Sequence, residues 1–364
     1  MQSDTVIFVR ALEPTMRLLV IADPELPVPP RFYGGIERVI ALLVDGLVAR
    51  GHEVTLVAHA DSHTSARLVA YRSGGPGVAS APRRATSIAR AALRHRPQVI
   101  HSFGRLATLG PVLPWRVPKV MSYQREITPR TVRWASRLAH GTLSFTGCSR
   151  RLIEPVADLA RWHVIYNAVP VARYAFTGVV PGDAPLVFLG RFERIKGPHI
   201  AIDVARRAGR RLVMAGPILP DETAQSYFRD EIQPHIDGHA VSYVGPVDDE
   251  QKSALLQSAA ALLMPVLWDE PFGIVMAEAL ACGTPVLGLA RGAVPEVVAD
   301  GLTGIVAKDA DGLVAAVLRV SSLSRAACRA AAETRFSPAA LVDAYEEVYA
   351  GLVGGDGVRT RAVA

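Results

Sequence analysis

Cysteine is scarce in this chain, and long apolar runs are missing. The three cysteines (Cys148, Cys282 and Cys328) are odd in number and far apart, which excludes a disulfide framework or a zinc knuckle. They fit a reducing environment, so we expect a cytoplasmic protein. No apolar run approaches the roughly 18 to 20 residues that a membrane span needs. We also expect no signal peptide, because the first residues lack a basic segment, an apolar core and a small-residue cleavage site.

Charge is plentiful but unevenly distributed. Of 364 residues, 50% are hydrophobic and 20% are charged, which is typical of a globular protein long enough for two domains. Residues 1–180 hold 23 Lys and Arg against 11 Asp and Glu, a net charge of +12, whereas residues 181–364 hold 17 against 23, a net charge of −6. This segregation predicts two units with different partners.

Short apolar runs alternate with helix-length amphipathic segments, a pattern typical of parallel α/β sheets. The first series of predicted strands comprises residues 16–23, 52–58, 97–103, 119–123, 142–148 and 162–167, with a helix at residues 36–51. After a Gly- and Pro-rich segment, the second series comprises residues 186–191, 211–216, 240–245, 261–266, 285–289 and 304–307. Two such series predict two Rossmann-like, doubly wound parallel-sheet domains that face each other across a cleft.

The domain boundaries follow from where these patterns start and stop. The first buried-strand signal begins at Met16. We predict an N-terminal extension (residues 1–15), a first domain (16–175), a linker (176–184), a second domain (185–335), a C-terminal helix (336–354) and a flexible tail (355–364).

Two glutamates, Glu270 and Glu278, lie eight positions apart in the apolar stretch WDEPFGIVMAEALACGTPV. Pro271 and Gly273 predict a loop, followed by a helix at residues 274–282. Both acids then lie at the carboxyl edge of a parallel sheet, where such folds bind ligands. Helix electrostatics is the alternative explanation for Glu270. It explains Glu278 poorly, because burial of a carboxylate without donors is costly, whereas two adjacent ligand hydroxyls would satisfy it.

A basic loop indicates an anion site. In LGRFERIKG, Arg191 and Lys196 follow a predicted strand and precede a helix that begins at Pro198. Cations beside a helix N-terminus at a sheet edge suit a phosphate or diphosphate. A solvated basic loop is the alternative.

A glycine pair indicates a second position at which the backbone is able to approach a ligand closely. In FYGGIERV, Gly34 and Gly35 follow the first strand and open the first long helix. Paired glycines allow backbone amides to approach a ligand, although such a pair also begins ordinary helices.

Patterns that would indicate other chemistry are weak. Asp309 and Asp311 match a DxD pattern but precede a predicted helix, so a helix N-cap is favoured. His59, Asp61 and His63 fall in a polar loop without a helical frame. Neither set predicts a metal site.

These segments resemble retaining glycosyltransferases of family 4, which have the two-domain GT-B fold. The signature of that family is a pair of glutamates separated by seven residues, here followed by CGTPV. The resemblance runs from Met16 to about Tyr349 and includes FYGGIERV, RGHEVTLVAHADS, VIYNAV, LGRFERIKG, SYVGPVDDEQK and RGAVPEVVADGLTG in family order. Within that family, the chain resembles the branch with sugar transferases of secondary-metabolite biosynthesis.

The resemblance implies a role for each matched residue. Arg191 and Lys196 would neutralise the diphosphate of a nucleotide-sugar donor, so that neither a metal nor another cofactor is expected. Glu278 would hold the ribose hydroxyls, and Glu270 would be the catalytic carboxylate at the transferred sugar. The other donor contacts would come from Phe272, Gly273 and Ile274 near sugar and phosphate, Val244 and Gly245 near the base, and Gly34 and Gly35 at the diphosphate.

The acceptor half departs from the family pattern. His101 is implied as a catalytic or positioning residue, with a core histidine at a strand end as the alternative. The histidine usual two places later is replaced by Phe103. A later strand offers Tyr123-Gln124 in place of a histidine, and the usual Asn-Gly turn reads Asn167-Ala168. The donor half is therefore intact and the acceptor half altered.

The sequence is best interpreted as a retaining glycosyltransferase that moves a sugar from a nucleotide-diphosphate sugar to a hydroxyl acceptor. The alternative is a sugar-nucleotide binding protein without transfer activity. The basic first half predicts an acidic acceptor or a peripheral location at the inner face of the membrane. Nucleic-acid binding is not expected, because the chain has no recognisable reader motif or aromatic platform.

Overall fold

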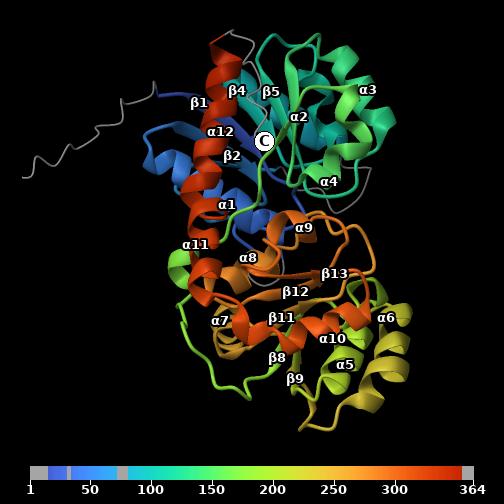
Figure 1. The fold of residues 1–364 in the computed structure, drawn as a ribbon. Coiled ribbons are helices and arrows are strands. Elements are labelled where there is room, and N and C mark those ends of the chain that lie inside the picture. Colours follow the sequence, from blue (N-terminus) through green and yellow to red (C-terminus); the bar gives the residue numbers. More distant parts are fainter. Residues whose placement is uncertain (1–14, 31–33, 72–80, 355–364) are drawn as a thin grey trace, which may run out of the picture.

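The computed structural model describes residues 15–30, 34–71 and 81–354, which form two α/β units joined by an irregular segment (Figure 1). Most of the predicted N-terminal extension and the whole predicted tail, residues 355–364, lie outside the described residues. Within the described part of the chain, no helix is both long and apolar enough to cross a membrane.

The first unit contains a seven-stranded parallel sheet in the order β3-β2-β1-β4-β5-β6-β7. Its strands are β1 (Arg17–Ile21), β2 (Glu53–Ala58), β3 (Arg67–Ala70), β4 (Val99–Ser102), β5 (Lys119–Tyr123), β6 (Leu143–Gly147) and β7 (Trp162–Val164). Its helices are α1 (Gly35–Ala49), α2 (Ala81–His95), α3 (Pro129–Leu138) and α4 (Arg150–Ile153).

The second unit contains a six-stranded parallel sheet in the order β10-β9-β8-β11-β12-β13. Its strands are β8 (Leu186–Leu189), β9 (Leu212–Ala215), β10 (Val241–Tyr243), β11 (Ala261–Met264), β12 (Val286–Leu289) and β13 (Gly304–Ala307). Its helices are α5 (Pro198–Arg207), α6 (Glu222–Tyr227), α7 (Asp249–Ser258), α8 (Ile274–Ala281), α9 (Val294–Val297), α10 (Ala310–Leu318) and α11 (Arg325–Arg335).

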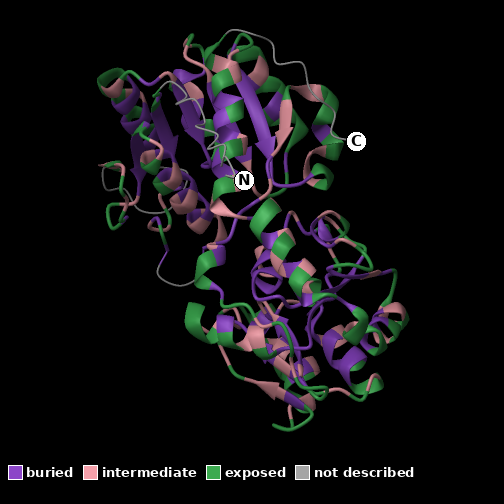
Figure 2. Cartoon of the chain, turned by 60° about the vertical axis from the view of Figure 1, so that its left-hand side comes forward, coloured by how far each residue is buried: buried purple, intermediate pink, exposed green. Residues whose placement is uncertain are grey.

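Most strands are continuous apolar runs in the sequence because both of their faces are buried. Helices cover both faces of each sheet, so most strand side chains are enclosed (Figure 2). Each sheet has one apolar cluster on either face. The predicted fold class, two Rossmann-like doubly wound sheets, is confirmed. The strand β3 was not predicted, because its four residues at the sheet edge are half exposed and lack a buried-strand pattern.

The C-terminal helix α12 (Pro338–Val353) returns to the first unit. Figure 1 shows it running along that unit, in red. Its buried residues Leu341, Val342, Tyr345 and Tyr349 belong to the apolar cluster that lines one face of the first sheet. The chain therefore crosses between the two units twice.

Polar contacts join the facing edges of the two units. Arg38 on α1 is 2.6 Å from Asp249 on α7. On the other side, the backbone amides of Arg150 and Arg151 donate to the Glu296 carboxylate at 2.8 and 2.7 Å. Each of these residues lies in the helix that follows the carboxyl end of a parallel strand. The ligand-binding edges of the two sheets are therefore turned toward each other.

Candidate functional site

The predicted basic loop and Glu270 meet at the switch point of the second sheet. The strand order reverses between β8 and β11, so the loops that follow these strands lie side by side. The first loop contains Lys196, and the second contains Glu270. The backbone amide of Leu267 donates to the carbonyl of Ile195 at 2.8 Å and fixes one loop to the other. A crevice of this kind is the usual ligand site of doubly wound sheets.

Glu270 is held by a cation and an indole. Glu270 is 8% exposed, and its Oε2 lies 2.5 Å from Lys196 Nζ. The indole N–H of Trp268 donates to the same oxygen at 2.9 Å. The Lys196 ammonium also lies 4.7 Å from the centre of the Trp268 ring. These donors offset the cost of burying the carboxylate and fix its direction.

A third loop fixes the backbone of Glu270. The amide of Ala293, between β12 and α9, donates to the Glu270 carbonyl at 2.8 Å. Gly292 has a φ of 54°, and a Cβ there would lie 2.1 Å from the Glu270 nitrogen. Gly292 therefore allows a close approach that other residues exclude. Gly292 and Ala293 lie in the family segment RGAVPEVV, for which the sequence alone indicates no role.

Glu278 lies inside α8, as predicted, and is 7% exposed. Its Oε1 lies 2.5 Å from Lys252 Nζ on α7 and accepts a hydrogen bond from the Tyr174 hydroxyl at 2.8 Å. Neither partner was predicted. Lys252 was inconspicuous on a polar helix, and Tyr174 precedes Glu278 by 104 positions. Only the fold brings the three side chains together.

Arg191 lies in the same basic loop but has a different carboxylate partner. Its Nε is 2.9 Å from Glu193 Oε2, and its side chain is 28% exposed. The loop ends at Gly197, whose φ of 74° permits a turn into α5. The loop thus presents two cations at the N-terminal end of a helix, where a phosphate is favoured.

The glycine pair of the first unit reaches the second unit. Gly34 precedes α1 with a φ of 150°, and Gly35 is the first residue of that helix. A Cβ on Gly35 would lie 2.8 Å from Cδ1 of Ile274, the first residue of α8. The N-terminal ends of α1 and α8 therefore converge, which places the predicted amides of Phe272, Gly273 and Ile274 opposite the glycine pair.

Two family models together match most of the chain. "Glycosyltransferase Family 4" matches residues 33–173, and "Glycosyl transferases group 1" matches residues 176–335. The chain belongs to glycosyltransferase family 4. The first match begins after β1 and includes β2 to β7, and the second includes β8 to β13.

Relatives of this family 4 glycosyltransferase include two mycobacterial enzymes. The glycogen synthase of Mycobacterium tuberculosis is 29% identical over 88% of this chain and 89% of its own length. The phosphatidyl-myo-inositol mannosyltransferase of Mycolicibacterium smegmatis is 29% identical over 84% of each chain.

Solved structures show that the fold is GT-B. AviGT4, a glycosyltransferase involved in avilamycin A biosynthesis, is 26% identical with a TM-score of 0.70, over 93% of this chain and 98% of its own. The Anabaena protein HepE, solved with UDP and glucose, has a TM-score of 0.69 at 20% identity, over 92% of this chain and 100% of its own. The predicted family and fold class are confirmed.

In this family 4 glycosyltransferase, Val244 and Gly245 follow β10 at the outer edge of the second sheet. Val244 is 49% exposed, and Gly245 has a φ of 79°. The Gly245 carbonyl accepts from the Gly216 amide at 2.9 Å, and a Cβ on Gly216 would lie 1.9 Å from the Gly190 carbonyl oxygen. The loops after β8, β9 and β10 therefore form one continuous row that includes the basic loop.

His101 does not lie at an accessible position. It is 1% exposed, with Nδ1 2.5 Å from the Tyr349 hydroxyl and Nε2 2.6 Å from the Ser122 hydroxyl. Burial lowers its pKa to about 3, so the imidazole stays neutral. The catalytic or positioning role of His101 that the resemblance implies stays a prediction. The alternative left open by the sequence, a core histidine, describes its placement, because α12 covers it.

The two other departures from the family pattern meet in space. Nδ2 of Asn167 donates to Oε1 of Gln124 at 2.8 Å. Asn167 is 3% exposed, and its Oδ1 has no hydrogen-bond partner. Gln124, in the segment that lacks the family's histidine, is thus bonded to the asparagine of the altered Asn167-Ala168 turn.

None of the other predicted patterns forms a site. Asp309 caps α10 by accepting from the Gly312 amide at 2.9 Å, as expected, and Asp311 lies 2.6 Å from Arg207. In residues 15–30, 34–71 and 81–354, no group of three or more His, Cys, Asp or Glu side chains is arranged to hold a metal ion.

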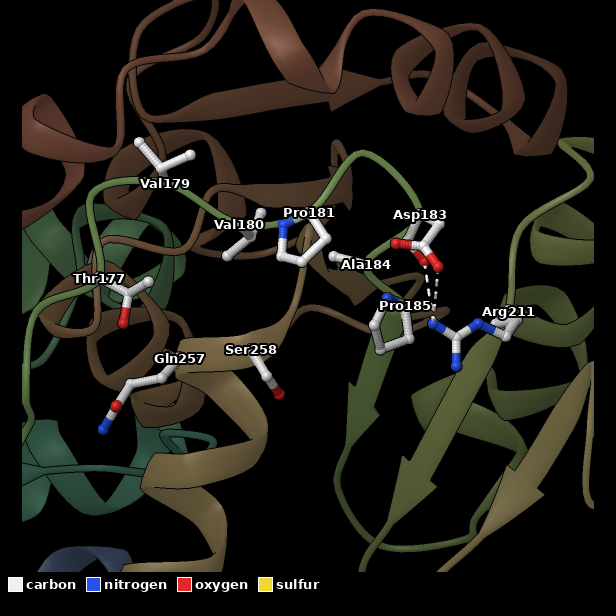
Figure 3. Close-up of a pocket in the computed structure, with 10 residues that line it drawn as sticks. All are labelled: Thr177, Val179, Val180, Pro181, Asp183, Ala184, Pro185, Arg211, Gln257 and Ser258. Carbon is white, nitrogen blue, oxygen red and sulfur yellow. Dashed lines mark hydrogen bonds and ion pairs between the residues drawn. The ribbon is translucent and has the colours of Figure 1, made fainter.

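An open hollow of about 370 Å³ lies beside the linker, away from the glutamates (Figure 3). Its lining includes Val180 and Pro181 from the linker and Gln257 and Ser258 from the end of α7, and no residue predicted for the donor site. It is therefore not part of the candidate site.

Proposed function

We propose that this protein is a retaining glycosyltransferase that transfers a sugar from a nucleotide-diphosphate donor to a hydroxyl acceptor. The observation that supports this most strongly is the pair of buried carboxylates, Glu270 and Glu278, each beside a lysine at the switch point of the second sheet. The fold neighbour HepE, solved with UDP and glucose, is consistent with a donor of this class.

The donor would extend along the carboxyl edge of the second sheet. Glu278 would accept from the ribose hydroxyls, and Val244 and Gly245 would contact the base. The diphosphate would lie between Arg191 and Lys196, with further donors from the amides of Phe272, Gly273 and Ile274 and from Gly34 and Gly35. In this arrangement the base contacts follow β10, the two cations follow β8, and both glutamates follow β11.

The chemistry follows from where charge develops. The bond between the anomeric carbon and the diphosphate oxygen breaks, and its electron pair goes to the diphosphate. The acceptor oxygen bonds to the anomeric carbon from the same face, and its proton passes to the departing diphosphate. An ammonium has three N–H donors, so Lys196 is able to bind the diphosphate while it holds Glu270. Glu270 would stabilise positive charge on the sugar or orient its ring.

We propose that catalysis needs no metal, because Arg191 and Lys196 supply the positive charge that metal ions supply elsewhere. We also propose that the basic first unit binds an acidic acceptor or an anionic membrane surface. Its helix α3 contains no acidic residue and exposes Arg130, Arg133 and Arg137 beside Trp134, which is 50% exposed.

A donor panel tests the transfer reaction. The protein is incubated with nucleotide-diphosphate sugars and an acceptor panel, and products are identified by mass spectrometry. The anomeric configuration is read by proton NMR, and parallel reactions contain a chelator. We expect one donor to give a product of retained configuration at an unchanged rate with chelator. An inverted product would contradict the retaining mechanism, and binding without transfer or hydrolysis would favour the sugar-nucleotide binding protein.

A further inference from the structure

Lys252 occupies an unusual place beside Glu278. It is one of four lysines in the chain, and its side chain is only 12% exposed. Its Nζ lies 2.5 Å from Glu278 Oε1, and the Tyr174 hydroxyl donates to that same oxygen at 2.8 Å. Two donors from distant parts of the chain therefore converge on one oxygen of one buried carboxylate.

The two donors leave Oε1 of Glu278 without a lone pair for a ligand. A carboxylate oxygen has about two hydrogen-bond acceptor sites, so Lys252 and Tyr174 fill the capacity of Oε1. No donor from the described residues is assigned to Oε2. That oxygen has the capacity to accept from two further hydroxyls, which is what the vicinal 2′- and 3′-hydroxyls of a ribose supply.

A second carboxylate keeps Lys252 in place. Asp249, one turn earlier on α7, lies 3.2 Å from Lys252 Nζ, and its other oxygen lies 2.6 Å from Arg38 Nη1 on α1. Burial alone would raise the pKa of Asp249, but the two cations outweigh it and hold that pKa below its ordinary value. An ion-pair chain thus runs from α1 of the first unit through Asp249 and Lys252 to Glu278.

We propose that Lys252 is a positioning residue for the donor nucleotide: it saturates Oε1 of Glu278 so that Oε2 alone faces the ribose. This rests on the proposed function, since it takes Glu278 as the ribose ligand. Lys252 acts through Glu278 and sets how strongly the protein distinguishes a ribonucleotide from its 2′-deoxy counterpart. A merely structural lysine would affect both nucleotides equally.

The test compares affinities for paired nucleotides. Whichever of UDP, GDP and ADP binds best is titrated by calorimetry against the wild type and K252M, together with its 2′-deoxy form. A hydrogen bond to a carboxylate contributes enough that the wild type should prefer the ribonucleotide by about tenfold or more. K252M should reduce that preference to below about threefold, whereas K252R, which keeps the charge, should retain most of it.

Matched variants separate the possible outcomes. K308M makes the same change at an exposed lysine and should leave the preference intact. Y174F, which removes the other donor to Oε1, should lower the preference and serves if K252M does not fold. If E278A abolishes the preference while K252M and Y174F keep it, the positioning role is wrong and the ribose role stands. If the wild type shows no preference, or E278A keeps it, the ribose role itself is wrong.

Discussion

Glu270 and Glu278 are buried to nearly the same degree, 8% and 7% exposed, but different parts of each residue are fixed. The backbone of Glu270 is bonded to the loop before α9, and its carboxylate contacts Lys196 and Trp268. The backbone of Glu278 belongs to α8, and only its side chain has external partners. These differences lead to separate predictions for the two acids.

Replacing Glu270 should impair transfer more than donor binding. In E270Q the side chain keeps its size but loses the charge that we propose acts on the sugar in the transition state, so we expect kcat to fall by roughly 100-fold or more. The dissociation constant for the donor should change by less than about tenfold. Steady-state kinetics and calorimetry measure both, with E222Q at an exposed position as the control. An unchanged kcat would show that Glu270 has no catalytic role.

Gly292 should be as necessary as Glu270 itself. In G292A the new Cβ would meet the Glu270 backbone nitrogen at 2.1 Å, so the loop must move and turn the carboxylate away. Gly301 also has a positive φ, 76°, but a Cβ there has no atom within 4 Å. Both variants incur strain of about 1 kcal/mol. Only G292A should lose most of its turnover, and equal activity in the two variants would contradict the positioning role.

The site residues that could be proposed from the sequence are those that belong to local motifs. Glu270, Glu278 and Lys196 belong to local motifs whose loops and helices could be assigned from proline and glycine positions. Lys252 and Tyr174 could not be predicted, because their contact with Glu278 depends on how α7 and the segment before the linker pack on α8. The roles assigned to the predicted residues stay predictions.

At the scale of the elements, helix α12 covers His101 and separates it from the surface. Tyr345 and Tyr349 on this helix enclose the imidazole, and the Ser122 hydroxyl bonds to both His101 and Tyr345. The prediction of a catalytic histidine considered only the end of one strand. It could not include a helix that begins more than 200 residues later and covers that strand.

This burial predicts an acid-dependent contribution to stability. The folded pKa of His101 is about 3, against an ordinary value of about 6.5, so the unfolded chain binds the extra proton between these values. Stability is therefore lost as the pH falls through that window, by up to about 1.4 kcal/mol per pH unit. H101N lacks this loss, so its deficit relative to the wild type should shrink from pH 6.5 to 4.5.

Urea unfolding at several pH values measures this difference. The control is H140N, at an exposed histidine whose replacement should keep the acid response of the wild type. A stability difference between wild type and H101N that stays constant from pH 7.5 to 4.5 would contradict the neutral, buried state of His101.

At the scale of the whole molecule, the first half of the chain is basic and the second half is acidic. The structure places part of the excess on α2 and α3, neither of which contains an acidic residue. Exposed Trp134 and Leu93 lie among these arginines. Aromatic and basic side chains together suit an anionic lipid surface.

We predict that the protein sediments with anionic vesicles at low salt. R130Q/R133Q/R137Q should lose most of this binding, since each arginine near a membrane contributes about 1 kcal/mol. The control triple variant R206Q/R211Q/R229Q changes exposed arginines of the second unit and should bind like the wild type. Absence of co-sedimentation at low salt would exclude the membrane surface and leave an acidic acceptor as the partner of the first unit.

We propose that the second unit binds a nucleoside diphosphate through Glu278 and the basic loop. Thermal unfolding with UDP, GDP, ADP or TDP tests it most directly, because a ligand at 100 times its dissociation constant adds about 2.7 kcal/mol of stability. We expect one of the four to stabilise the wild type clearly, and E278A to lose that stabilisation. Stabilisation by none of them, or an equal stabilisation of E278A, would contradict the account.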